Sequence, residues 1–207
     1  MSATTGMPSS ATAPSPPTID DEIEAIAVSS VPTPNPDALM FRVEDTLVPT
    51  GTWEFSDPAV AAVQAPLAHR LLVLPGVELV LIAPRFVTVR KTPSQGWPEL
   101  VPTVKRAIRE LLWSGEMAVY DAAVQATGPD LSAVEARIVA LLDEEIRPAI
   151  AQDGGDVTFM GFIDGYVQLR MIGACGTCPS STATLKMGIE RLLVEEIPEV
   201  LGVEQVY

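Results

Sequence analysis

The chain has 207 residues, 47% of them hydrophobic and 19% charged, which is typical of a soluble globular protein with room for two small domains. Its 27 acidic residues outnumber its 13 basic ones and give a formal net charge of -14. Because this charge repels phosphate backbones and anionic lipids, we expect neither a nucleic-acid partner nor a membrane partner. No apolar run reaches the roughly 18 residues that a spanning helix needs.

The first 18 residues contain no Lys, Arg, Asp or Glu and no apolar run. A secretory signal needs an apolar stretch, and a transit peptide is rich in Arg, so neither is expected here. A segment of Ser, Thr, Pro and Ala buries too little apolar surface to order itself. We therefore expect a disordered tail at residues 1–18 and a cytoplasmic protein.

Residues 19–116 have the pattern of a small α+β domain. The predicted elements, in chain order, are strands at 23–31 and 39–43, a helix start at Asp57-Pro58, a helix at 65–74, strands at 77–83 and 86–91, and a helix at 98–114. The second pair of strands flanks the short turn Pro84-Arg85, which favours antiparallel pairing. Gly115 follows the last helix and is suited to end it. Nothing in this segment has the pattern of a catalytic site.

A change in composition at residues 117–130 predicts a linker, and residues 131–207 are predicted to form a second domain. Ser132 and Glu135 have the spacing of a helix-capping box, and the helix that follows is expected to weaken at Pro148. The pair Asp164-Gly165 favours a type I′ turn, which joins two strands of a hairpin. The predicted order is α-β-β-α-β, from a helix starting at residue 133, strands at 157–163 and 166–172, a helix up to about 197 and a short strand at 203–207.

The two cysteines of the chain, Cys175 and Cys178, lie between the second hairpin strand and the following helix. Two thiols at this spacing can reach one metal centre from a single turn, and the small residues around them leave backbone N–H groups free to approach sulfur. The positive end of the following helix favours thiolates and any anionic cluster that they hold. The spacing therefore predicts a metal or redox site at Cys175 and Cys178.

The number of ligands limits the kind of site. Tetrahedral zinc and cubane iron–sulfur centres usually take four protein ligands, whereas this chain has two cysteines and one histidine, His69, which belongs to the other domain. A symmetric dimer with its two-fold axis beside the cysteine loop brings four thiolates together. A site shared between subunits opens easily, which suits a cluster that is passed on.

Two other functions fit the same pair of cysteines. A dithiol–disulfide oxidoreductase also has a CxxC motif at the start of a helix, but the predicted hairpin in front of it differs from a βαβ crossover. A zinc ion bridging two chains for a purely structural purpose is the other alternative.

Several short motifs occur together in the second domain: Leu142-Asp143-Glu144, Ile146-Arg147-Pro148-Ala149-Ile150, Asp153-Gly154-Gly155-Asp156-Val157, Gly173-Ala174-Cys175, Cys178-Pro179-Ser180-Ser181, Thr184-Leu185-Lys186 and Ile197-Pro198-Glu199-Val200. In this combination residues 131–207 closely resemble the NifU-like C-terminal domain. The first domain resembles the Nfu N-terminal domain through Thr33-Pro34-Asn35-Pro36, Phe41, Ala65-Pro66-Leu67-Ala68, Gly76-Val77, Phe86-Val87-Thr88-Val89 and Trp97.

The resemblance implies a non-enzymatic carrier or scaffold. It implies that Cys175 and Cys178 are the ligands of a labile [4Fe–4S] cluster held between two subunits of a cluster-dependent homodimer. It also implies that the partners are upstream cluster-assembly machinery and the apo iron–sulfur proteins that receive the cluster.

Overall fold

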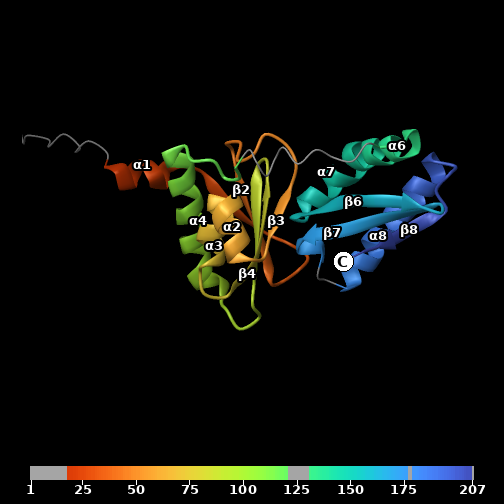
Figure 1. Ribbon diagram of the computed structural model, residues 1–207. Coiled ribbons are helices and arrows are strands. Elements are labelled where there is room, and N and C mark those ends of the chain that lie inside the picture. The colour runs from red at the N-terminus through yellow and green to blue at the C-terminus, as the bar shows by residue number, and fades with distance from the viewer. Residues whose placement is uncertain (1–17, 121–130, 177–178, 207) are drawn as a thin grey trace, which may run out of the picture.

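The computed structural model describes residues 18–120, 131–176 and 179–206 of the chain. The chain forms two halves that lie side by side, and each half combines helices with one β-sheet (Figure 1). The first half contains a five-stranded sheet and the second a three-stranded sheet. This arrangement confirms the α+β class that the sequence predicts.

The first half is an antiparallel sheet with helices on one face. Its elements are α1 (Ile19–Ala25), β1 (Val28–Pro32), β2 (Ala38–Val43), β3 (Trp53–Phe55), α2 (Pro58–Gln64), α3 (Pro66–Leu72), β4 (Val77–Ala83), β5 (Phe86–Lys91) and α4 (Trp97–Ser114). The strands are arranged in the order β1-β2-β5-β4-β3. Asp57 caps α2 by accepting a hydrogen bond of 2.8 Å from the backbone of Ala59, and Gly115 ends α4 with a φ of 68°.

The strand predicted at 23–31 is wrong over its first residues, because residues 19–25 form α1 and the strand begins at Val28. Thr18 and Asp21 form a capping box, which satisfies backbone N–H groups at the start of this helix. Acidic side chains in the first turn add a favourable interaction with the helix dipole. Local capping therefore outweighs the alternation of apolar residues that favoured a strand.

The second half follows the predicted order of elements. It consists of α6 (Ala133–Leu141), a π-helical turn (Leu142–Ile146), α7 (Arg147–Gln152), β6 (Gly155–Ile163), β7 (Tyr166–Gly173), a 3-10 turn (Ala174–Gly176), α8 (Pro179–Glu196) and β8 (Gly202–Gln205). Strands β6 and β7 pair antiparallel and β8 adds parallel to β7. The Asp164-Gly165 turn has φ values of 50° and 86°, which confirms the predicted hairpin.

The helix that starts at Ser132 is interrupted in front of Pro148. The capping box of Ser132 and Glu135 is present, as predicted. Pro148 has no backbone N–H to donate, and the wider π-helical turn lies immediately before the segment that contains it. Ile138, Leu142 and Ile150 remain buried on one side of this interrupted helix.

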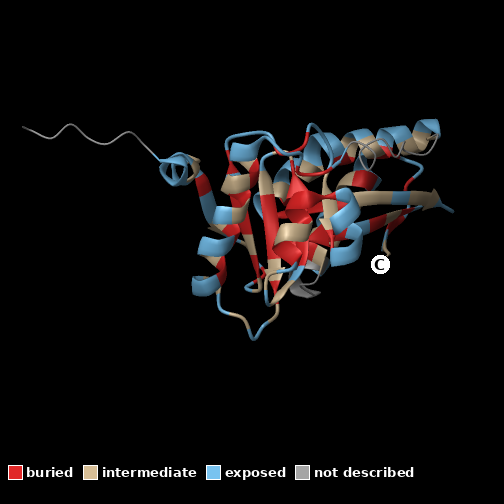
Figure 2. Cartoon of the chain, turned by 60° about the vertical axis from the view of Figure 1, so that its left-hand side comes forward, coloured by how far each residue is buried: buried red, intermediate tan, exposed pale blue. Residues whose placement is uncertain are grey.

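The central strands of the first sheet, β2, β4 and β5, are largely buried on both faces (Figure 2). Side chains alternate along β4, so that Val80 and Ile82 face the core under α2, α3 and α4. Leu79 and Leu81 point the other way and pack against Ile172 of β7. The second half of the molecule therefore covers the sheet face that the helices leave open.

The segment expected to be a linker begins inside the first core. Ala118 and Val119 are buried there, and the backbone N–H of Tyr120 donates to the carbonyl oxygen of Gln64 at 2.8 Å. Residues 121–130 lie outside the described part of the chain, as does the tail up to residue 17. The domain limits at 19–116, 117–130 and 131–207 stay a prediction.

The two longest helices, α4 and α8, have 18 residues each. Both carry charged side chains on their exposed positions. Among the residues that the structure describes, none of the helices is long and apolar enough to span a membrane.

Candidate functional site

Cys175 lies in the 3-10 turn that connects the end of β7 to the start of α8. This position confirms the predicted loop between a strand and a helix N-terminus. The residue is only 5% exposed. Cys178, the other predicted ligand, falls outside the described residues, together with Thr177.

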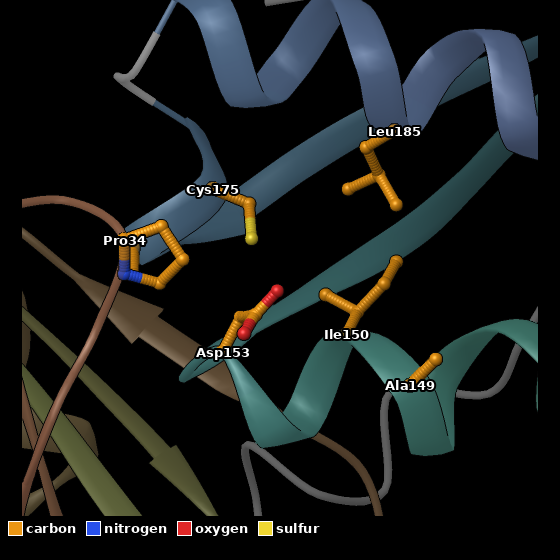
Figure 3. A pocket seen from close by; sticks show the side chains of 7 residues that line it. Pro34, Ala149, Ile150, Asp153, Cys175 and Leu185 are labelled. Atoms are coloured by element: carbon orange, nitrogen blue, oxygen red, sulfur yellow. The ribbon is translucent and has the colours of Figure 1, made fainter.

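The Cys175 side chain points into a cavity of about 120 Å³ between the two halves of the molecule (Figure 3). Ile150 and Asp153 of the α7 segment and Leu185 of α8 enter it from the second half. Pro34, from the loop between β1 and β2, closes it from the first half. The thiol therefore faces a mainly apolar space whose walls come from one chain.

The Pro-rich loop that carries Pro34 is fixed by hydrogen bonds on both sides of this residue. The hydroxyl of Thr33 donates to the carbonyl oxygens of Asn35 and Ala38 at 2.9 and 3.0 Å. The indole N–H of Trp97 donates to the carbonyl oxygen of Pro36 at 3.0 Å. The wall opposite Cys175 is consequently held in place by hydrogen bonds to several parts of the first half.

The Cys175 thiol fits beside β6 because Gly155 has no side chain. A Cβ atom added to Gly155 would lie 2.6 Å from Sγ and 3.0 Å from Cβ of Cys175, and 3.0 Å from the carbonyl oxygen of Ile172. Contacts this short force atoms to move. The second glycine of the Asp153-Gly154-Gly155-Asp156 motif is therefore part of the cysteine site as well as the start of a strand.

We expect Gly155→Ala to lower the free energy of unfolding by about 1–3 kcal/mol, because the new methyl group overpacks the site and displaces the Cys175 turn. Urea unfolding of the metal-free protein measures this change. Gly188→Ala is the matched control, because a Cβ at Gly188 in α8 meets nothing within 4 Å. There the substitution should raise stability by about 1 kcal/mol, as glycine is a poor helix former. Equal unfolding midpoints for Gly155→Ala and the wild type would contradict the close contact.

The acidic residues near the site do not form a metal site of their own. Asp156 is 6% exposed, and its carboxylate lies 3.8 Å from the guanidinium of Arg147, which also lies 3.0 Å from Asp143. Asp153 caps α7 and is exposed. Within the described ranges no three His, Cys, Asp or Glu side chains are grouped closely enough to hold a metal ion.

His69 does not reach Cys175. It belongs to α3, which packs on the helix-covered face of the first sheet, whereas Cys175 lies beyond the opposite face. Among the described residues of one chain, too few possible metal ligands lie near Cys175 to complete a centre with four ligands.

Both halves match a described protein family. Residues 28–115 match the family described as "Scaffold protein Nfu/NifU N terminal", and residues 138–204 match the "NifU-like domain". The chain belongs to the Nfu/NifU-like family. The resemblance inferred from its short motifs is thereby confirmed for both halves.

Relatives within the Nfu/NifU-like family align along most of the chain. The human "NFU1 iron-sulfur cluster scaffold homolog, mitochondrial" is 42% identical over 177 residues, which are 84% of this chain and 69% of the relative. "NifU-like protein 4, mitochondrial" of Arabidopsis thaliana is 39% identical over 180 residues, 84% of this chain and 63% of the relative. A solution structure of a NifU-like protein from Saccharomyces cerevisiae covers 55% of this chain and 98% of its own, with 21% identity and a TM-score of 0.42.

The expected cytoplasmic location is wrong by this comparison, since the human, Arabidopsis and Drosophila relatives are named as mitochondrial. The expectation rested on the composition of residues 1–18 alone. That composition is independent of the two folded halves that the relatives share, so it is a poor guide to where this family acts.

Sequence reasoning missed the contacts that three residues of the first half make with the cysteine-bearing edge of the second. The side-chain amide of Asn35 donates to the carbonyl oxygen of Ala174 at 3.5 Å. The hydroxyl of Thr88 donates to the carbonyl oxygen of Gly154 at 2.7 Å, and a carboxylate oxygen of Glu54 accepts from the N–H of Gly173 at 2.6 Å. Thr88 belongs to a motif by which the family was recognised, but its position in a strand gave no indication of this contact. Glu54 lies in β3, a strand of three residues that the sequence did not predict.

Proposed function

We propose that this chain is an iron–sulfur cluster carrier or scaffold that binds a labile [4Fe–4S] cluster between two copies of itself. Cys175 and Cys178 of each copy are the four ligands. The observation that carries the proposal is the place of Cys175, in a turn that opens onto a helix N-terminus, in a chain whose relatives are named iron–sulfur cluster scaffolds.

The count of ligands supports a shared centre. A cubane cluster usually takes four protein thiolates, and this chain has two cysteines. The described residues around Cys175 offer no substitute set of ligands. Two copies related by a two-fold axis beside the turn supply what one copy lacks.

Release of the cluster follows from ligand exchange. A cysteine of the receiving apo-protein loses its proton to become a thiolate and binds one iron as the bond from that iron to Cys175 or Cys178 breaks. The departing thiolate takes up a proton. No electron is transferred, so the oxidation state of the cluster is kept, and repeating the exchange moves the whole cluster to the target.

Metal and sulfide analysis of protein purified without oxygen tests this function. We expect a brown protein with visible absorbance and about four iron and four sulfide per two chains. Incubation with an apo iron–sulfur protein should then move this absorbance to the target.

The same measurement separates the alternatives. A colourless dimer with zinc and no sulfide would indicate a structural zinc bridge. A metal-free monomer with a reducible disulfide would indicate an oxidoreductase. The antiparallel hairpin of β6 and β7 in front of the cysteine turn differs from the βαβ crossover associated with thioredoxin-like sites, which favours the carrier.

A further inference from the structure

A row of four side chains crosses the sheet of the first half on the face that meets the second. Met40 of β2, Thr88 of β5, Leu81 of β4 and Glu54 of β3 lie opposite one another across four neighbouring strands. The first three are 0% exposed. We call these four residues the docking row.

The docking row meets two glycines that flank the cysteine site. A Cβ atom on Gly154, just before β6, would lie 2.9 Å from Oγ1 of Thr88 and 3.3 Å from Cβ of Met40. On Gly173, at the end of β7, it would lie 3.0 Å from Cδ1 of Leu81. Both glycines have positive φ, +74° and +70°, which other residues rarely adopt. Two glycines thus allow the first half to approach the backbone beside Cys175.

The polar members of the docking row bind the backbone of these glycines. Thr88 donates to the carbonyl oxygen of Gly154, and Glu54 accepts from the N–H of Gly173, at 2.7 and 2.6 Å. The second bond involves a carboxylate and is of the stronger, charge-assisted kind. Cys175 follows Gly173 by two residues, so these contacts hold the turn on which the thiol is placed.

The first half lies on the side of the turn that the Cys175 thiol faces. In the docked chain the Cys175 thiol faces a cavity that Pro34 of the same chain closes. For a cluster shared by two copies, the cysteine turn of a second copy has to stand beside the first. The first half must therefore move away from the turn before the second copy can approach.

We propose that the docking row caps the cysteine turn in the cluster-free chain and separates from it when two copies bind a cluster. This inference rests on the function proposed above. The cap keeps a reactive thiol covered while no cluster is present, and the bonds from iron to sulfur supply the free energy that displaces it. In the cluster-free state the docking row contacts Gly154 and Gly173 of the same chain.

The reactivity of Cys175 in the metal-free protein tests the cap. In a Cys178→Ser background Cys175 is the single thiol, and its reaction with an aromatic disulfide reagent reports how often the cap opens. We expect Glu54→Ala combined with Thr88→Val to raise the reaction rate about tenfold or more, because the docked state loses both hydrogen bonds from these side chains to the backbone of Gly154 and Gly173.

The matched control is Glu44→Ala combined with Thr103→Val in the same background. Both residues are exposed in the first half, and this pair loses the same charge and the same hydroxyl. We expect its rate to equal that of the parent. Circular dichroism of each variant checks that the first half is folded. Val is nearly isosteric with Thr, and at position 88 it also suits the strand β5.

Hydrogen exchange in the unmodified chain gives a second measurement that needs no substitution. The N–H of Gly173, whose acceptor is Glu54, should be protected in the cluster-free protein and should lose protection after cluster loading. Equal thiol rates in the docking-row variant and the control, or equal protection of Gly173 with and without cluster, would overturn the cap. The thiol assay uses metal-free protein, so it decides the cap even if cluster binding itself fails.

Discussion

Cys175→Ser and Cys178→Ser should each abolish stable cluster binding. One substitution in the chain removes two of the four ligands, because the centre is shared by two copies. We expect the iron and sulfide content of the reconstituted protein to fall at least about tenfold below that of the wild type, as measured by chemical analysis and visible absorbance.

Ala183→Ser is the control for these cysteine variants. It places a hydroxyl at an exposed position near the start of α8 and leaves both thiols in place, so the cluster content should be that of the wild type. Thermal unfolding of the metal-free variants should show that the fold survives the loss of either thiol. A single cysteine variant with full iron and sulfide would exclude the shared centre.

Cluster binding should convert the protein from monomer to dimer. Residues 131–207 contain 12 acidic and 5 basic residues, a formal charge of -7 per copy, so two copies repel each other most strongly at low salt. The turn that must lie at the two-fold axis is small and offers little apolar surface to oppose this repulsion. The free energy of cluster binding then becomes the free energy of association.

Analytical ultracentrifugation of apo and reconstituted protein at matched salt measures this change. The apo-protein should be largely monomeric at micromolar concentration, the loaded protein dimeric, and transfer of the cluster to a target should restore the monomer. The Cys175→Ser variant, treated in the same way, should stay monomeric. An apo-protein that is already fully dimeric would show that protein contacts hold the pair together.

Local signals in the sequence predicted most elements of the fold. The Asp164-Gly165 turn, the Ser132 capping box and Gly115 each fix a backbone conformation over a few residues, so they can be recognised without knowledge of the rest of the chain. The first residues of the chain's first predicted strand were one exception, and the short strand β3 was another. In the first of these, a capping box at Thr18 competes with an apolar pattern, and local hydrogen bonds favour the helix.

The contacts around the cysteine turn could not be predicted in this way. The docking row exists only because four strands from separate parts of the chain are aligned in register, and one of them, β3, is too short to give a pattern. Gly154 follows the end of α7, where its positive φ suits the end of a helix. Its second property, close approach to Thr88, depends on the other half of the molecule.

The π-helical turn at Leu142–Ile146 determines which side of the following helix, α7, faces the cavity. The apolar side chains of this segment recur every four residues, at Ile138, Leu142, Ile146 and Ile150. In a regular α-helix four residues turn about 400°, so such a stripe drifts by about 40° per step and by about 120° over three steps. The π-helical turn is wider, so each of its residues rotates by a smaller angle, and this compensates part of the drift. Ile150 and Asp153 consequently face Cys175 (Figure 3) on a helix whose first turns are anchored in the core.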